Sequence, residues 1–133
     1  MERMTDMGVM KINRLIFGRL VLDALASAGG KAFPASEKGK LLAGIGGSRP
    51  AAGEIADNLV VKEEADGSLL LKLYIIMSFG SSIQLATGQI LDSLEGDLKP
   101  MFPGQSGRIV LKITGVKSKQ IAPRDIEVER TWN

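Results

Sequence analysis

Two groups of carboxylates are the residues that could do acid or base chemistry in this sequence. They are Glu63, Glu64 and Asp66 near the middle of the chain and Asp125, Glu127 and Glu129 near its end. General acid and base catalysis needs two carboxylates that converge on one substrate, with the pKa of at least one of them shifted. Adjacent acids on a tight turn point apart into water. The sequence therefore predicts no catalytic residue and a protein that is not an enzyme.

The absence of His and Cys limits nucleophilic, redox and metal chemistry. Without an imidazole or a thiolate there is no Ser-His or Cys-His pair and no zinc site of nitrogen and sulfur ligands. The run Gly104-Gln105-Ser106-Gly107-Arg108 resembles a nucleophile elbow, but Arg108 replaces the last glycine of that motif. The glycine-rich runs 30–40 and 44–49 lack the spacing of a phosphate-binding loop. We predict no metal ligand and no cofactor-binding residue.

Length and composition favour one globular domain that covers residues 1–133. The chain has 133 residues, 44% of them hydrophobic and 24% charged, which is enough apolar material for a core without disulfides. Seventeen Lys and Arg against fifteen Asp and Glu give a net charge of +2. The longest apolar run, 69–77, contains Lys72 and is shorter than the roughly 20 residues that cross a bilayer. We expect a cytoplasmic protein, with peripheral association at the inner face of the membrane as an option.

The first half of the chain predicts a helix, a connector and a hairpin. Apolar residues recur at helical spacing after Asn13, a favourable N-cap, and the helix should end near Ala28. The glycine-rich connector 29–53 follows, with a short helix at Leu41-Leu42-Ala43 as one expectation and a mobile segment as the other. Strand-like runs 59–62 and 69–77 flank Asp66-Gly67, a strong turn signal, and predict an antiparallel hairpin.

The second half predicts a helix, a strand and a tail. Ser81 and Gln84 have the spacing of a capping box, and Lys99-Pro100 marks the expected end of the helix. An alternating strand over 108–114 follows. In the tail 117–133, residues 125–130 alternate and form either a fourth, edge strand or a solvated end. The resulting fold class is α+β: a two-layer sandwich of a small, mainly antiparallel, three- to four-stranded sheet with two helices on one face.

Alternation along 69–77 separates a core face from an opposite face. The predicted core face holds Leu69, Leu71, Leu73, Ile75 and Met77. The opposite face is half apolar, and its predicted partner-binding residues are Leu70, Lys72, Tyr74, Ile76, Val110 and Lys112. Open antiparallel faces are usually polar, so this mixture favours a surface covered by a partner or a second copy. The alternatives are that the C-terminal tail folds over it or that it is simply exposed.

The stretch 106–124 is locally basic. It contains five cations and no acid, and the predicted anionic-surface residues are Arg108, Lys117, Lys119 and Arg124. Lipid headgroups and nucleic-acid backbones attract such clusters equally. Nucleic acid is the less favoured of the two, because RNA binding on an open sheet uses stacking aromatics and only Tyr74 is available there. A solvated basic loop is the third interpretation.

The order helix, hairpin, helix, strand carries a specific pattern. Residues 73–83 read Leu-Tyr-Ile-Ile-Met-Ser-Phe-Gly-Ser-Ser-Ile, and residues 109–116 read Ile-Val-Leu-Lys-Ile-Thr-Gly-Val. Together with the opening Gly8-Val9-Met10-Lys11-Ile12, they resemble the alkaline shock protein family, the envelope stress response family of Gram-positive bacteria, over about 8–116. The resemblance implies a non-enzymatic scaffold of cell-envelope homeostasis that self-associates as a homo-oligomer or docks to a small membrane-anchored protein. The alternative function is a small nucleic-acid-binding module that uses the basic stretch 106–124.

Overall fold

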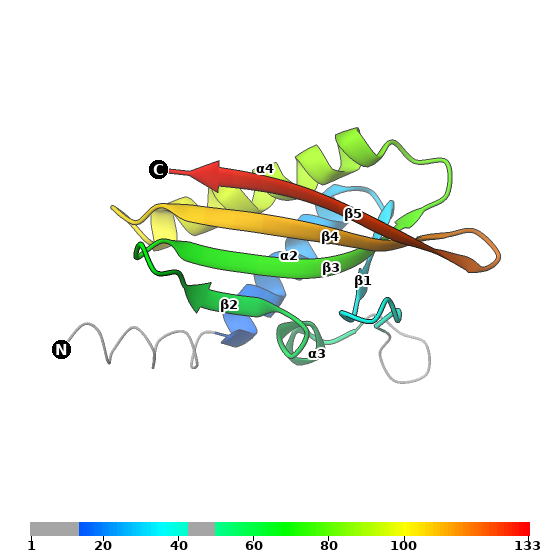
Figure 1. Cartoon of the computed structure of the whole chain (residues 1–133), viewed down its shortest axis with the longest axis horizontal. Helices are drawn as coiled ribbons and strands as arrows, with labels where there is room; N and C mark the ends of the chain where they lie inside the picture. Colours follow the sequence, from blue (N-terminus) through cyan, green and yellow to red (C-terminus); the bar gives the residue numbers. More distant parts are fainter. Residues whose placement is uncertain (1–13, 43–49) are drawn as a thin grey trace.

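The computed structural model describes residues 14–42 and 50–133, and Figure 1 shows the arrangement of their elements. In chain order these elements are α2 (Arg14–Ser27), β1 (Ala32–Ala35), α3 (Ala52–Ala56), β2 (Val60–Glu63), β3 (Leu69–Ser78), α4 (Ile83–Met101), β4 (Gly107–Lys117) and β5 (Ile121–Trp132). The protein is α+β, as predicted. The expected Asn13 cap, the opening run 8–12 and the glycines of 44–49 lie outside the described residues.

The five described strands form one open sheet that is mainly antiparallel. Its order is β1-β3-β4-β5, and β2 also pairs with β3, on residues 69–72, while β1 pairs with residues 74–77. The predicted hairpin is confirmed as β2 and β3. Only β3 and β4 are parallel, because α4 carries the chain back between them. The count of three to four strands was too low: the tail supplies the optional fourth strand as β5, and the connector supplies β1, which was not predicted.

The predicted core face of β3 is confirmed. Its five alternating side chains are buried in one cluster with residues from α2, α4, β4 and β5. Among the helices, Phe17 and Val21 of α2 and Ile90 and Leu94 of α4 belong to this cluster. Helix α3, the third described helix, packs on α2 at Gly18, where an added Cβ would lie 2.1 Å from the Ala52 carbonyl oxygen. A glycine is therefore needed for this close approach.

The helix α4 differs from the prediction at both of its ends. Its N-cap is Ser82, whose hydroxyl accepts a hydrogen bond from the Leu85 N–H, whereas the Ser81 hydroxyl donates to the Ser78 carbonyl. At the other end Pro100 lies inside the last turn and the helix continues to Met101. Proline lacks an N–H and its ring crowds the carbonyl four residues earlier, which disfavours it inside a helix. Here Pro100 is the penultimate residue of α4, and the helix ends one residue after it.

The described parts of the connector, residues 29–42 and 50–53, contain a strand and the start of a helix. No helix forms at Leu41; this residue makes an isolated antiparallel bridge with Ala35, and the Leu42 N–H donates to the Pro34 carbonyl. The prediction of a short helix at Leu41 is therefore wrong, and the short helix α3 that begins near the end of the connector was not predicted. In the tail, the edge-strand alternative is confirmed, because β5 pairs with β4 along its length. No helix among the described residues is both long enough and apolar enough to cross a membrane.

Candidate interaction surfaces

The predicted partner face of the sheet is already covered within the chain. Leu70, Tyr74, Ile76 and Val110 are only 6%, 8%, 0% and 4% exposed. This corrects the expectation that they form a half-apolar surface needing a partner or a second copy. The tail does not cover them either, because β5 lies beside β4 in the sheet.

Residues of the connector bury the end of this face near Tyr74. Ala35, Tyr74 and Ile76 form a second small apolar cluster, and Phe33 and Leu41 pack against it. The Lys72 ammonium lies 5.9 Å from the centre of the Tyr74 ring, which is a cation-π contact. Burial raises the pKa of Tyr74, with smaller contributions from Glu37 and, in the opposite direction, Lys112. The glycine-rich composition of the connector hid this covering role from sequence reasoning.

Salt bridges cross the rest of this face. Arg108 bonds Glu64 at 3.0 Å and lies 3.7 Å from Glu129. The hydrogen bond to Glu64 is the main cause that raises the pKa of Arg108. Because its charge is already paired, Arg108 does not join the predicted anionic surface.

Lys112 is held in the same way. Its ammonium lies 3.2 Å from Asp125 and 3.5 Å from Glu127, and the hydrogen bond to Asp125 is the main cause that raises its pKa. The acids of β5 were considered above only as candidate catalytic groups. In the structure they are the counterions of β4, so the stretch 106–124 is not one continuous basic surface.

The other three predicted cations lie at the opposite end of β4. Lys117 is the last residue of β4, Lys119 is exposed in the turn, and Arg124 is exposed in β5. The Lys117 ammonium lies 5.9 Å from the centre of the Phe33 ring, and Arg124 donates to the carbonyl of its neighbour Pro123. The structure therefore brings Lys117, Lys119 and Arg124 together at the β4–β5 hairpin and separates them from Arg108.

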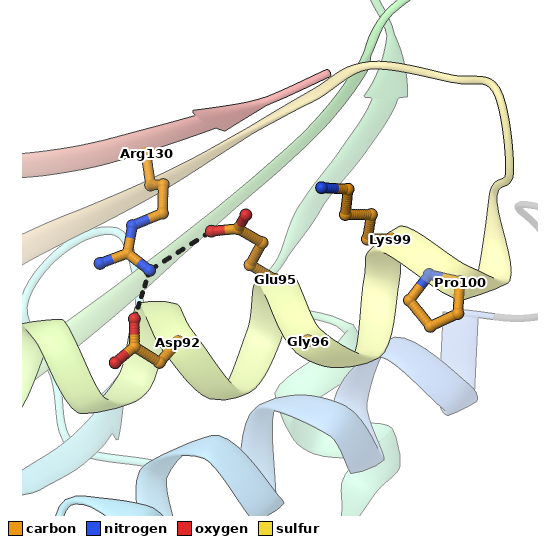
Figure 2. A pocket seen from close by; sticks show the side chains of 6 residues that line it. All are labelled: Asp92, Glu95, Gly96, Lys99, Pro100 and Arg130. Carbon is orange, nitrogen blue, oxygen red and sulfur yellow. Dashed lines mark hydrogen bonds and ion pairs between the residues drawn. The ribbon is translucent and has the colours of Figure 1, made fainter.

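A shallow pocket of about 570 Å³ lies between α4 and β5. Figure 2 shows that Arg130 of β5 reaches over α4 between Asp92 and Glu95. The Arg130 guanidinium makes a short contact with Asp92 and a 3.3 Å contact with Glu95, and the Asp92 bond is the main cause that raises the pKa of Arg130. Both acids pair with the Arg130 guanidinium, so these ion pairs hold β5 against α4. Arg130 is therefore not available to bind an anionic ligand in this pocket.

The exposed apolar side chains at one end of the sheet were missed by sequence reasoning. Phe79 is 73% exposed just after β3, Leu85 is 65% exposed in the first turn of α4, and Ile121 is 37% exposed at the start of β5. The Phe79-Gly80 junction was noted above only as part of a family pattern. Alternation could not find this group, because its members come from three elements that meet only in the folded chain.

The described residues contain no candidate metal site. No group of three or more carboxylates lies close enough to hold a metal ion within residues 14–42 and 50–133. Comparison with protein-family models, with curated proteins and with solved structures found no match for this chain. The surfaces described above are therefore the basis for a functional proposal.

Proposed function

We propose that this protein is a non-enzymatic scaffold of cell-envelope homeostasis that docks to a membrane-associated partner through the edge strand β5. The proposal takes the chain as a two-layer sandwich with α2 and α4 on one face. The observation that carries it is the edge itself. β5 spans Ile121–Trp132, ends the sheet, pairs only with β4 among the described strands, and has mostly exposed side chains. Long edge strands are templates for pairing with another chain.

The charges of β5 favour a foreign strand over a second copy. Asp125, Glu127 and Glu129 alternate on one face of β5. If two copies paired edge to edge in antiparallel fashion, these acids would stand opposite acids, and like charges directly opposite one another destabilise a sheet. Although these acids contact the cations of β4, the side chains of Asp125, Glu127 and Glu129 remain 90%, 47% and 43% exposed. A partner strand with Lys or Arg at alternate positions would stand opposite them with favourable charge. Self-association, the other option above, is therefore less favoured at this edge.

The resemblance to the alkaline shock protein family supports the envelope setting. The residues that carry it, 73–83 and 109–116, correspond to the end of β3 with the start of α4, and to most of β4. These elements hold β5 in place. The acid pair of α4, Asp92 and Glu95, is already bonded to Arg130 and is therefore not suited to catalysis. The partner that the resemblance implies is a small membrane-anchored protein.

The test compares charge variants of the edge in cells and in solution. Glu127→Lys with Glu129→Lys should abolish recovery of the chain with the membrane fraction and crosslinking to its partner. The matched control is Asp23→Lys with Asp57→Lys, which makes the same charge change at exposed sites on α2 and at the end of α3. Unfolding curves must show that both variants remain folded. Sedimentation that gives a monomer at every concentration, with no membrane-protein partner crosslinked by the wild-type chain, would refute the proposal.

A further inference from the structure

One end of the molecule gathers exposed apolar side chains on neighbouring loops. Figure 1 shows the β3–α4 connection and the β4–β5 hairpin projecting from this same end of the sheet. The Phe79 N–H donates to the Lys117 carbonyl at 2.9 Å, and Lys117 pairs with Ile121. Phe79 and Ile121 therefore lie on either side of the end of β4, at the same end of the sheet. Leu85 follows on the first turn of α4.

The same end carries positive charge without acids. The segments 26–31, 78–91 and 115–124 contain Lys31, Lys117, Lys119 and Arg124, and no Asp or Glu. The acids that directly follow the segments 78–91 and 115–124 are bonded elsewhere: Asp92 to Arg130 and Asp125 to Lys112. Asp23 and Glu37 flank the segment 26–31. Within residues 14–42 and 50–133, none of these four cations has an ion pair with an acid, whereas Arg108 at the other end of β4 is paired with Glu64 and Glu129.

A cleft of about 390 Å³ lies between the end of α2 and the start of α4. Lys31, Gly80, Ser82 and Leu85 contribute to its lining. It faces the N-terminal turn of a 19-residue helix, where the helix dipole is positive. The cleft thus adds a recess with hydroxyl groups and a cation beside the exposed Phe79 and Leu85.

We propose that this end docks onto an anionic lipid bilayer. Phe79 and Leu85 enter the headgroup region, Ile121 borders it, and Lys31, Lys117, Lys119 and Arg124 contact headgroup phosphates. Apolar burial and attraction to anionic lipid act together in peripheral membrane binding. The inference deepens the proposed envelope function, on which it rests: it places the docking edge β5 next to the bilayer where a membrane-anchored partner would be met.

A bilayer fits this surface better than nucleic acid. Single strands bind through aromatic side chains that stack on successive bases along a basic groove. This end offers one exposed aromatic residue, Phe79, beside the aliphatic Leu85 and Ile121. Aliphatic side chains gain free energy when they leave water for the acyl boundary, whatever their geometry.

The test is binding of the purified full chain to vesicles. We expect binding to vesicles of phosphatidylcholine with phosphatidylglycerol and none to phosphatidylcholine alone. Lys117→Glu with Lys119→Glu should weaken binding by about 25-fold or more, since each cation near an anionic surface changes affinity about fivefold. Phe79→Ser should weaken it by about tenfold. Phe79→Trp should keep binding, and its added fluorescence should shift to shorter wavelength when vesicles are present.

Matched controls remove the same chemistry from elsewhere in the molecule. Leu15→Ser changes an exposed apolar residue at the start of α2, and Lys62→Glu with Lys99→Glu reverses two exposed cations outside the proposed surface. Both controls should bind as the wild type does. Thermal unfolding of every variant establishes that it is folded. Equal loss in control and test variants would overturn the inference.

Two further outcomes separate this inference from the proposed function. If the chain fails to bind anionic vesicles but still crosslinks to a membrane protein through β5, lipid docking is wrong and the scaffold function stands. If vesicle binding follows the predicted variants but no partner depends on β5, lipid docking stands and the scaffold function is wrong. Binding to a single-stranded oligonucleotide that ignores Phe79→Ser, with no binding to vesicles, would overturn lipid docking in favour of nucleic acid.

Discussion

The indole ring of Trp132 lies directly on Gly107, its partner across β4 and β5. A Cβ added at Gly107 would lie 2.1 Å from Trp132 Cη2, and the Trp132 Nε1–H donates to the Gln105 carbonyl at 3.1 Å. An aromatic residue that covers a glycine on the neighbouring strand restores the packing that the glycine lacks. This pair fixes the register of the last strand and closes the core at its end.

Gly107→Ala should therefore displace the indole and destabilise the protein by about 1–3 kcal/mol, the usual cost of overpacking a core. Trp132 is the single tryptophan of the chain, so its fluorescence should shift to longer wavelength as it becomes wet. Gly96→Ala is the control, because a Cβ there meets nothing within 4 Å and alanine favours a helix. Wild-type fluorescence and stability in Gly107→Ala would contradict the proposed contact.

Tyr74→Ala should destabilise the fold by about 3 kcal/mol, as expected for truncation of a large buried side chain. The sequence analysis placed Tyr74 among the partner-binding residues, whereas in the structure this side chain is buried against the connector. Urea unfolding measures the change directly. Tyr74→Phe keeps the ring and should stay within about 0.5 kcal/mol of the wild type. A folded, fully stable Tyr74→Ala variant would mean that the connector does not pack on this side chain.

The turn between β2 and β3 makes stability depend on pH. Asp66 accepts hydrogen bonds from the Ser68 hydroxyl and the Ser68 N–H, and these bonds, the hydroxyl first, lower the pKa of Asp66. A carboxyl whose pKa is lower in the folded than in the unfolded chain stabilises the fold above its unfolded pKa, about 3.9. That contribution is lost as the pH falls through the lower, folded pKa.

Asp66→Asn should flatten this part of the acid unfolding profile. The free energy of unfolding of the wild type and of the variant, measured by urea titration from neutral pH to about pH 2, should converge at the acid end. Asp23→Asn, at an exposed site on α2, controls for the removal of one negative charge. A constant difference between wild type and Asp66→Asn at every pH would contradict the role of the ionised carboxylate.

Sequence patterns predicted the parts of the fold that repeat locally. Alternation in 69–77 assigned the core face of β3 correctly, and Asp66-Gly67 placed the hairpin turn, because both signals depend on near neighbours in the chain. The connector was harder. Phe33 and Leu41 cover Ile76 only because the chain folds back over a distant strand, and no local period records that contact.

The candidate surfaces divide in the same way. The sequence located the cations of 106–124, but it could not show which of them are paired. Arg108 and Lys112 contact acids from other parts of the chain, whereas Lys117 and Lys119 contact none among the residues that the structure describes. The sequence analysis also did not predict that the Phe79 side chain is exposed. Pairing across strands and the meeting of separate loops are set by tertiary structure, so these features needed the folded chain.

The last prediction concerns the clamp that holds the docking edge. Arg130 ties β5 to Asp92 and Glu95 of α4, and its side chain is partly buried. Arg130→Gln should cost about 1 kcal/mol or less in global stability, because exposed ion pairs contribute little. The local effect should be larger: amides in the second half of β5 should exchange hydrogen faster in Arg130→Gln than in the wild type. High salt should have the same effect on the wild type, because it screens the ion pairs of Arg130 with Asp92 and Glu95. Arg124→Gln is the control for hydrogen exchange, since Arg124 donates to its neighbour's carbonyl and has no ion pair within the described part of the chain. If β5 is the docking edge, Arg130→Gln should also weaken crosslinking to the partner, and the loss should increase with the rate of amide hydrogen exchange in β5. Unchanged amide exchange in Arg130→Gln would show that Gly107 and Trp132 hold the strand without the ion pairs of Arg130.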